Sequence, residues 1–300
     1  MELKNGLLVY FLAIVSTTYS QSINDVTYFN YSLLPQTDFK AHSGNMSISR
    51  FEFNLSTPPI LIGKRVRFIN SLYYQNSQFS YSDDFANSQL FPSTLHDIRY
   101  NATIFVQLRK NWELLAVPRV LIRSDLNQSL SGKDLFASSF ITFVHAVKGN
   151  PNFKVGLGVI IIDNDFTGRP ILPAAILRYD SRKVKVELIY PRANFIYKQS
   201  DNFEFGLFAM VEGAISRISP LTFNNETADY LRAFQLVVAP SVSHRMYKSV
   251  FAHLKVGYAP IRSMELVNAD FESLKNQSYD IQSSLYIRAG VSLRVPLDKQ

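Results

Sequence analysis

Residues 95–108 read Leu-His-Asp-Ile-Arg-Tyr-Asn-Ala-Thr-Ile-Phe-Val-Gln-Leu, and apolar and polar side chains alternate along them. One face carries Ile98, Tyr100, Ala102, Ile104, Val106 and Leu108, and the other carries Asp97, Arg99, Asn101, Thr103 and Gln107. A period of two is the pattern of a β-strand with one apolar and one polar face. The segment is also longer than the usual globular strand of about five or six residues. Such length and alternation are typical of a strand that crosses a membrane as part of a barrel.

Segments of the same kind recur along the chain, and no helical pattern of convincing length follows residue 21. We predict fourteen strands, at residues 26–34, 46–55, 65–74, 96–109, 112–123, 136–148, 153–162, 171–180, 183–190, 193–198, 203–216, 230–243, 250–258 and 281–295. Short polar turns at 109–111, 148–152, 180–182 and 199–202 largely alternate with longer connectors at 75–94, 124–135, 163–170, 217–228 and 262–280. Outer-membrane barrels show this alternation, with short periplasmic turns and long external loops.

The strand count depends on the segment Tyr190-Pro191-Arg192. If both termini are periplasmic and this segment is a tight external turn, fourteen strands fit. If it lies within one bent strand, the count falls and the alternation of short and long connectors breaks. A soluble β-sandwich also alternates apolar and polar faces, but strand length and paired short turns favour the membrane barrel. The predicted fold is therefore all-β, an antiparallel up-and-down transmembrane β-barrel of about fourteen strands, with twelve as the alternative.

The N-terminus has the features of a secretory signal. A short region with Lys4 precedes ten apolar residues at 6–15, and Thr18-Tyr19-Ser20 places small residues before Gln21. The apolar run is too short for a spanning helix, which needs about 20 residues. We predict a cleaved signal peptide at 1–20, a barrel domain at 21–300 and a location in the outer membrane. The expected partners are then the barrel-assembly machinery, outer-membrane lipid and lipopolysaccharide.

Composition excludes several classes of function. The chain has no cysteine, so it has neither a disulfide framework nor a thiolate site. Its formal net charge is +7, but lysine and arginine are scattered singly and form no run of five or more. A nucleic-acid partner is therefore not expected. A basic balance remains compatible with anionic lipid or with a pore that attracts anions.

Several stretches resemble an uncharacterised family of Gram-negative outer-membrane β-barrels, a domain of unknown function. The likeness covers most of residues 28–295, and it is carried by Pro-Pro-Ile-Leu-Ile-Gly-Lys-Arg-Val-Arg-Phe-Ile-Asn at 58–70, Leu-His-Asp-Ile at 95–98, Trp-Glu-Leu-Leu-Ala at 112–116, Ser-Asp-Leu at 124–126, Phe-Thr-Gly-Arg-Pro at 166–170 with Leu172-Pro173, and Glu-Leu-Ile-Tyr-Pro-Arg-Ala-Asn-Phe-Ile-Tyr at 187–197. The resemblance implies the barrel fold and the outer-membrane compartment. It implies no activity and no functional residues.

No catalytic or metal-binding motif stands out. The five histidines lack ligand spacing, and His145 and His253 have serines nearby in sequence but no nucleophile-elbow signature. Asp163-Asn164-Asp165 lacks the twelve-residue pattern of a calcium loop. We therefore predict no enzyme, no cofactor and no metal.

The polar faces of the predicted strands carry the candidate functional residues. The candidate lumen-lining residues are Asp97, Arg99, Arg119, Arg123, Lys154, Lys183, Lys185, Glu187, Lys255, Arg288 and Arg294. Their basic excess would favour anions if the lumen is open, but a lumen filled by its own side chains is the other interpretation. The expected function is a passive channel or small-solute transporter with a basic lumen and small anionic solutes as candidates. The alternatives are a structural or surface-interaction barrel without an open pore and, after it, a membrane-embedded hydrolase.

Overall fold

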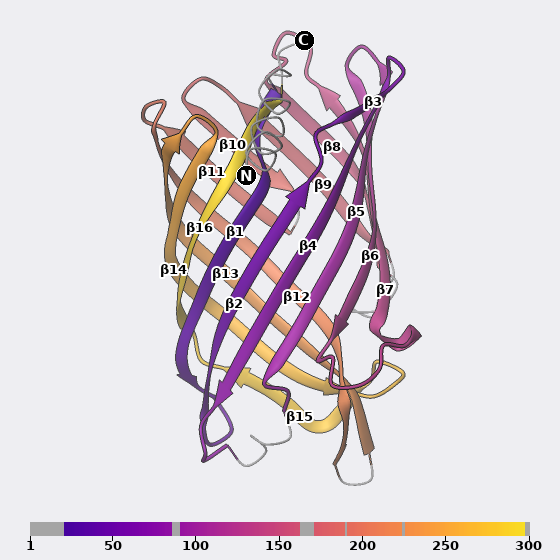
Figure 1. Ribbon diagram of the computed structural model, residues 1–300, viewed down its shortest axis with the longest axis vertical. Helices are drawn as coiled ribbons and strands as arrows, with labels where there is room; N and C mark the ends of the chain where they lie inside the picture. The colour runs from indigo at the N-terminus through magenta and orange to yellow at the C-terminus, as the bar shows by residue number, and fades with distance from the viewer. Residues whose placement is uncertain (1–20, 86–90, 163–170, 190, 224–225, 298–300) are drawn as a thin grey trace, which may run out of the picture.

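The computed structural model describes residues 21–85, 91–162, 171–189, 191–223 and 226–297, and Figure 1 shows them as a single barrel. The strands are β1 (Gln21–Asp38), β2 (Asn45–Ser56), β3 (Ile60–Ile62), β4 (Val66–Tyr81), β5 (Thr94–Arg109), β6 (Trp112–Ser124), β7 (Leu135–Ala146), β8 (Phe153–Ile162), β9 (Ile171–Asp180), β10 (Val184–Ile189), β11 (Arg192–Lys198), β12 (Phe203–Phe223), β13 (Glu226–Tyr247), β14 (Val250–Val267), β15 (Ser273–Ile281) and β16 (Ser284–Leu297). A short 3₁₀ helix, η1 (Gly132–Asp134), precedes β7. Within the described residues no helix is long and apolar enough to span a bilayer.

Fourteen of these strands form a closed antiparallel wall. The order is β13-β12-β11-β10-β9-β8-β7-β6-β5-β4-β2-β1-β16-β14, and pairing of β13 with β14 closes it. β3 pairs only with β4, and β15 only with β14 among the named strands. The predicted fourteen-strand barrel is confirmed. Ile189 of β10 pairs with Arg192 of β11, so two strands meet here and the twelve-strand alternative is wrong.

The two ends of the barrel differ in the length of their connectors, as the sequence predicts. Gln21 pairs with Leu297, so both terminal strands meet at one end (Figure 1), and the short turns at 110–111, 181–183 and 199–202 lie at the same end. We call this the turn end, and the opposite one the loop end. The predicted signal peptide, Asp163-Asn164-Asp165, the rest of the 163–170 connector and Tyr190 lie outside the described residues.

Three predicted loops contain strand instead. β4 continues to Tyr81, β14 continues to Val267 and is joined by β15, and β12 and β13 run through most of 217–228 as a paired hairpin. These stretches are rich in Ser, Asn and Thr and lack a regular apolar face. Their ladder hydrogen bonds come from neighbouring strands, and such bonds require no apolar face.

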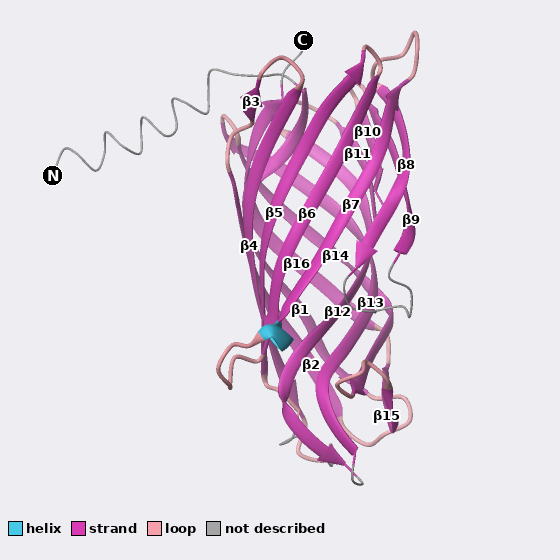
Figure 2. Ribbon diagram, turned by 90° about the vertical axis from the view of Figure 1, so that its right-hand side faces the viewer, coloured by secondary structure: helices cyan, strands magenta, loops and turns pink. Residues whose placement is uncertain are grey.

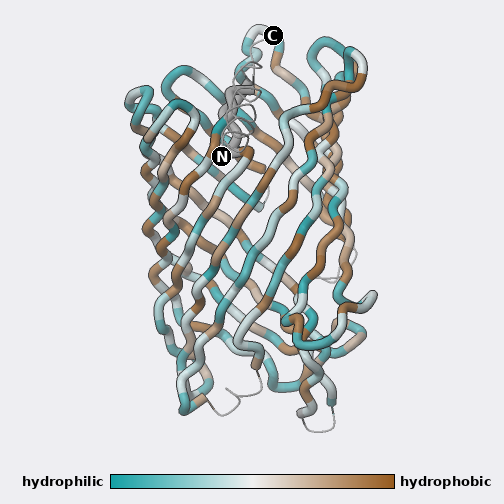
Figure 3. The backbone as a smooth tube through the Cα atoms, viewed as in Figure 1, coloured by the Kyte–Doolittle hydropathy of each residue, from teal (hydrophilic) through white to brown (hydrophobic). Residues whose placement is uncertain are grey.

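Exposure alternates along the wall as the sequence pattern requires, and Figure 3 shows hydrophilic and hydrophobic residues interspersed along the strands. Outward side chains are large, apolar and exposed over much of the wall, among them Phe29, Tyr31, Leu72, Tyr100, Val120, Phe143, Leu157, Leu188, Phe195, Leu207, Val256 and Val291. Their inward neighbours include charged side chains such as Asp97, Glu52 and Arg288, each at most 9% exposed. A closed barrel with an apolar outer surface and polar inward positions is the architecture of outer-membrane β-barrels.

The barrel narrows toward the loop end. Strands β7–β11 stop short of the full height, and beyond them β6 and β12 meet directly through a parallel bridge between Ser124 and Arg217. Figure 2 shows β8 and β9 ending well before β12 and β13. The strands on the far side of this bridge are β12-β13-β14-β16-β1-β2-β4-β5-β6, a ring of nine. We call this part the neck. About eight strands enclose a space that side chains can fill, so a ring of nine leaves little open lumen.

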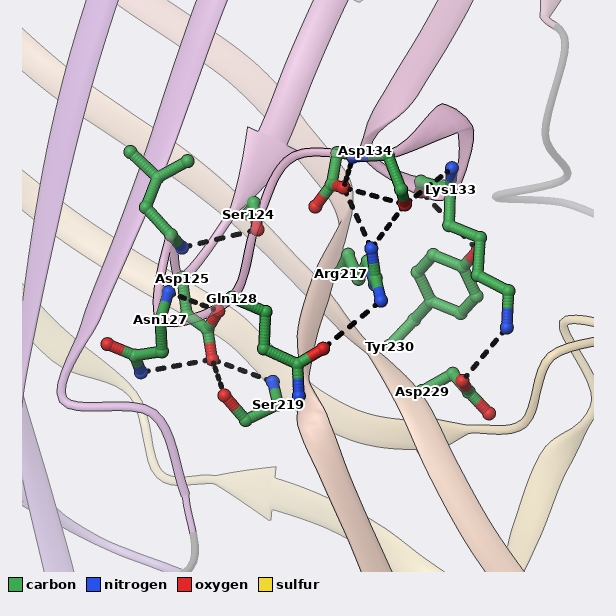
Figure 4. Close-up of polar contacts among 12 residues, drawn as sticks. Ser124, Asp125, Asn127, Gln128, Lys133, Asp134, Arg217, Ser219, Asp229 and Tyr230 are labelled. Atoms are coloured by element: carbon green, nitrogen blue, oxygen red, sulfur yellow. Dashed lines mark hydrogen bonds and ion pairs between the residues drawn. The ribbon is translucent and has the colours of Figure 1, made fainter.

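Polar contacts hold the β6–β12 junction together, as Figure 4 shows. The Asp125 carboxylate accepts hydrogen bonds from the backbone N–H and the hydroxyl of Ser219, at 2.7 and 2.8 Å. Arg217 Nη1 donates to Asp134 Oδ2 at 2.8 Å, and Asp134 in turn accepts the backbone N–H of Ser131. The β6–β7 connector is thus fastened to β12 by two buried carboxylates.

Apolar side chains fill the neck. A cluster of 22 buried residues draws members from β1, β2, β4, β5, β12, β13, β14, β15 and β16. The segment after β4 adds Phe85 and Phe91, whose rings lie 5.3 Å apart and both pack edge-on against Tyr279. Strand alternation implies an interior that is polar along its whole length. At the loop end the interior is apolar instead.

Candidate functional site

The interior between the turn end and the neck is built from ion pairs. Asp97 of β5 is 6% exposed and accepts Arg99 Nη2 at 2.6 Å and Arg123 Nε at 2.8 Å. The Arg99 guanidinium also lies over the Tyr73 ring, 4.5 Å from its centroid. The structure therefore brings three of the predicted lumen-lining residues together as one ion-paired group, in which two arginines share one carboxylate. Adjacent strands β5 and β6 position them, since Asp97 and Arg123 are cross-strand partners.

Other predicted residues also have partners. Arg288 Nη2 of β16 binds Glu52 Oε2 of β2 at 2.6 Å, and Arg294 Nη1 binds Glu204 Oε2 of β12 at 2.6 Å. Glu187 of β10 pairs with Arg178 of β9 at 3.0 Å. Lys255 Nζ lies 3.7 Å from the centroid of the Phe208 ring, a cation–π contact.

Arg119, Lys154, Lys183 and Lys185 are the remaining predicted residues. Arg119 and Lys154 stand on the inward faces of β6 and β8, and neither forms an ion pair with a described carboxylate. Lys185 is also inward and 8% exposed. Lys183 belongs to the turn before β10 and is exposed, so it lies at the rim of the turn end, outside the wall.

Sequence reasoning missed the group at the base of the neck. Arg50 Nη1 of β2 binds Glu212 Oε2 of β12 at 2.6 Å, and Gln235 of β13 donates its amide N–H to the same oxygen. Arg262 of β14 is the cross-strand partner of Gln235 and is 2% exposed. In the strand predicted at 46–55, Arg50 and Glu52 alternate with apolar residues. This alternation would have identified Arg50 as an inward residue.

Nearer the turn end, Arg67 Nη2 of β4 binds Glu113 Oε2 of β6 at 2.6 Å, another pair that the sequence analysis did not single out. Within the described ranges, no group of three or more His, Asp or Glu side chains is placed to hold a metal ion. His145 packs against Trp112 with ring centroids 4.6 Å apart, and its buried Nδ1 has no hydrogen-bond partner among the described residues.

The chain was compared with known proteins. No curated protein matches it significantly. Three solved structures have a similar backbone fold. An outer membrane channel from Pseudomonas putida F1 is 10% identical, covers 93% of this chain and 98% of its own, and has a TM-score of 0.47. The outer membrane phospholipase of Salmonella typhi (9% identity, 95% of this chain and 96% of that one, TM-score 0.38) and the toluene transporter TodX of P. putida (11% identity, 92% of this chain and 91% of that one, TM-score 0.38) are also similar. Such values are too low to assign a function. A family model described as "Domain of unknown function (DUF6268)" matches residues 16–294, and the chain belongs to this family.

Proposed function

We propose that this protein is an outer-membrane channel for small solutes in which anions are favoured. The observation that carries the proposal is the basic excess on the inward faces. Arg119 has no carboxylate partner among the described residues, and the acid that acts on Lys154, Glu113, is already bound by Arg67 at 2.6 Å. Asp97, Glu52, Glu204 and Glu187 are all engaged by arginines. Unpaired cations inside a low-dielectric wall raise the local concentration of anions.

The closed neck defines how such a channel would work. Phe85 and Phe91 belong to the neck cluster but lie between β4 and β5, outside the strands of the wall. In the proposed mechanism these rings move aside, a solute passes from the neck into the charged section, and the arginines and lysines there exchange water for the solute's negative group. The channel is passive, because nothing in this mechanism consumes energy.

The same closed neck favours a second candidate, a barrel without a pore that serves as a structural or surface-interaction protein. In that case the loop end would be permanently sealed, and the charged interior would only stabilise the barrel. Lipopolysaccharide and outer-membrane lipid would contact the outer surface in both cases.

Planar-bilayer recording of the purified protein separates the two candidates. A channel gives discrete current steps, and a salt gradient gives a reversal potential of the sign expected for anions. Arg119→Gln is expected to reduce this anion preference, and Arg109→Gln, at the exposed last residue of β5, is the control that leaves it unchanged. Absence of steps at any salt concentration would favour the sealed barrel.

A further inference from the structure

Arg262 is an arginine with an unusual environment. It belongs to the inward face of β14, because Ile261 before it is 51% exposed and Arg262 itself is 2% exposed. Its cross-strand partners are Gln235 of β13 and Ile281 of β15. Met264, the next inward residue of β14, and Ile281 belong to the apolar cluster of the neck. The side chain thus starts where the apolar neck ends and the charged section begins.

Among the described residues, no acid compensates the guanidinium of Arg262. Its buried Nη1 and Nη2 have no hydrogen-bond partner in the described part of the chain. The charged group that acts on it is Arg50, which has the same sign. Glu212 is already bound by Arg50 and by the amide of Gln235. Every other inward arginine named above except Arg119 has a carboxylate partner.

A buried guanidinium without a partner lowers the stability of the barrel. Burying an ion without a partner costs several kcal/mol, and replacing it by an apolar residue of similar volume is often neutral or stabilising. A buried cation of this kind is explained when an anion binds to it. The two Nη groups of a guanidinium present parallel N–H donors that match the two oxygens of a carboxylate or phosphate group.

We propose that Arg262, with Arg50 beside it, forms a binding site for the oxyanionic group of a small solute at the base of the neck. The solute class is a small carboxylate or phosphate. Arg262 binds two of its oxygens, Arg50 adds attraction, and Met264 and Ile281 contact the less polar part. The site deepens the proposed channel function, since it would be the point at which the solute passes from the neck into the charged section.

Binding is tested without any current measurement. The purified full-length protein in detergent is heated in sodium chloride, sodium acetate or sodium phosphate at equal ionic strength, and unfolding is followed by the change in gel migration. We expect a saturable rise of the unfolding midpoint in acetate, in phosphate or in both, compared with chloride, because a ligand of the folded state stabilises it. The salt that gives the rise identifies the group that binds. Equal midpoints in all three salts would overturn the site.

Two variants assign the effect to the residue. Arg262→Gln is expected to raise the apparent dissociation constant about tenfold or more, which corresponds to the loss of a charge-assisted bidentate contact. Arg262→Met is expected to unfold in chloride at the same temperature as the unchanged protein or a higher one, and to lose the oxyanion effect. Arg232→Met is the matched control, because Arg232 of neighbouring β13 is paired with Glu265 at 2.7 Å. It should keep the oxyanion effect.

An oxyanion effect that persists in both Arg262 variants would contradict the proposal. The channel function and this site can fail separately. If oxyanions stabilise the protein but the bilayer shows no current steps, the binding site is supported and the channel function is contradicted. If current steps occur but the unfolding midpoints are equal in the three salts, the channel function is supported and the binding site is contradicted.

Discussion

Arg50 of β2 and Glu212 of β12 form an ion pair of 2.6 Å although their strands lie five positions apart round the wall by the shorter route. Two side chains can meet in this way only where the barrel is narrow. The direct contact of β6 with β12 makes it narrow at this height, because it removes β7–β11 from the ring. The pair therefore marks the base of the neck.

Removal of Glu212 should be destabilising. In Glu212→Ala the side chain of Arg50, which is 10% exposed, loses its carboxylate partner. Because the Glu212 side chain is itself 25% exposed, the loss should be smaller than the about 3 to 5 kcal/mol of a fully buried pair. The measurement is the urea midpoint of the protein folded into lipid vesicles. Glu113→Ala is the control, since its partner Arg67 is 32% exposed and can be solvated by water. A loss in Glu113→Ala as large as that in Glu212→Ala would contradict this interpretation.

Gly44 is expected to be essential to the packing of the neck. It has a φ of +95°, and a Cβ at this position would lie 2.7 Å from Cβ of Phe85. Gly44→Ala should therefore cost the backbone strain of about 1 to 3 kcal/mol and also displace Phe85. Gly63→Ala carries a similar strain at φ +64° but meets no atom within 4 Å. The difference in urea midpoint between the two variants measures the Phe85 contact, and equal midpoints would exclude it.

The outer surface should tolerate charge only outside the bilayer. Leu157, in the middle of β8, is 75% exposed on the outward face, and Leu157→Arg is expected to cost about 2 to 4 kcal/mol in a lipid vesicle. Leu130 is 58% exposed in the β6–β7 connector, and Leu130→Arg should change stability by less than about 0.5 kcal/mol. If both variants are neutral, the apolar surface does not face lipid.

Acid should loosen the β6–β7 connector. Burial on its own would raise the pKa of Asp134, but hydrogen bonds from Ser124, Ser131 and Arg217 outweigh it and hold the pKa below the usual 3.8. A carboxyl with a depressed pKa stabilises the fold at every pH above its unfolded-state pKa, and the effect disappears as the pH falls through the folded-state pKa. The amide protection factors of residues 125–134 should be high at pH 7 and should fall as the pH drops below 3.8. Asp134→Asn should show low protection factors at both pH values.

Local pattern was enough to predict most of the wall. Each of the fourteen barrel strands overlaps a segment predicted from alternation, and the tight turn between β10 and β11 follows from parity alone. Asp97, Arg99 and Arg123 were predicted to share the interior, and they form one ion-paired group. These features depend on neighbours in sequence or on adjacent strands, which a period of two reveals.

The neck could not be predicted in the same way. The bridge between Ser124 and Arg217 joins strands that are 93 residues apart in the chain, and no periodic signal encodes it. Arg262 was missed because its segment, 262–280, has the composition of a loop, although β15 pairs with it there. Phe85 and Phe91 also lie in a stretch without alternation, and only the folded connector shows that they fill the interior.

The opening of the neck decides whether this barrel conducts, and one recording tests it. Phe85 and Phe91 are 3% and 4% exposed and close the loop end together with Tyr279. Planar-bilayer currents are measured for the unchanged protein and for the Phe85→Ala/Phe91→Ala variant, after both are shown to be folded by heat-modifiable migration. We expect brief, rare steps in the unchanged protein and long, frequent, anion-selective steps in the variant. A folded variant that gives no steps would contradict the proposal that this barrel is a channel.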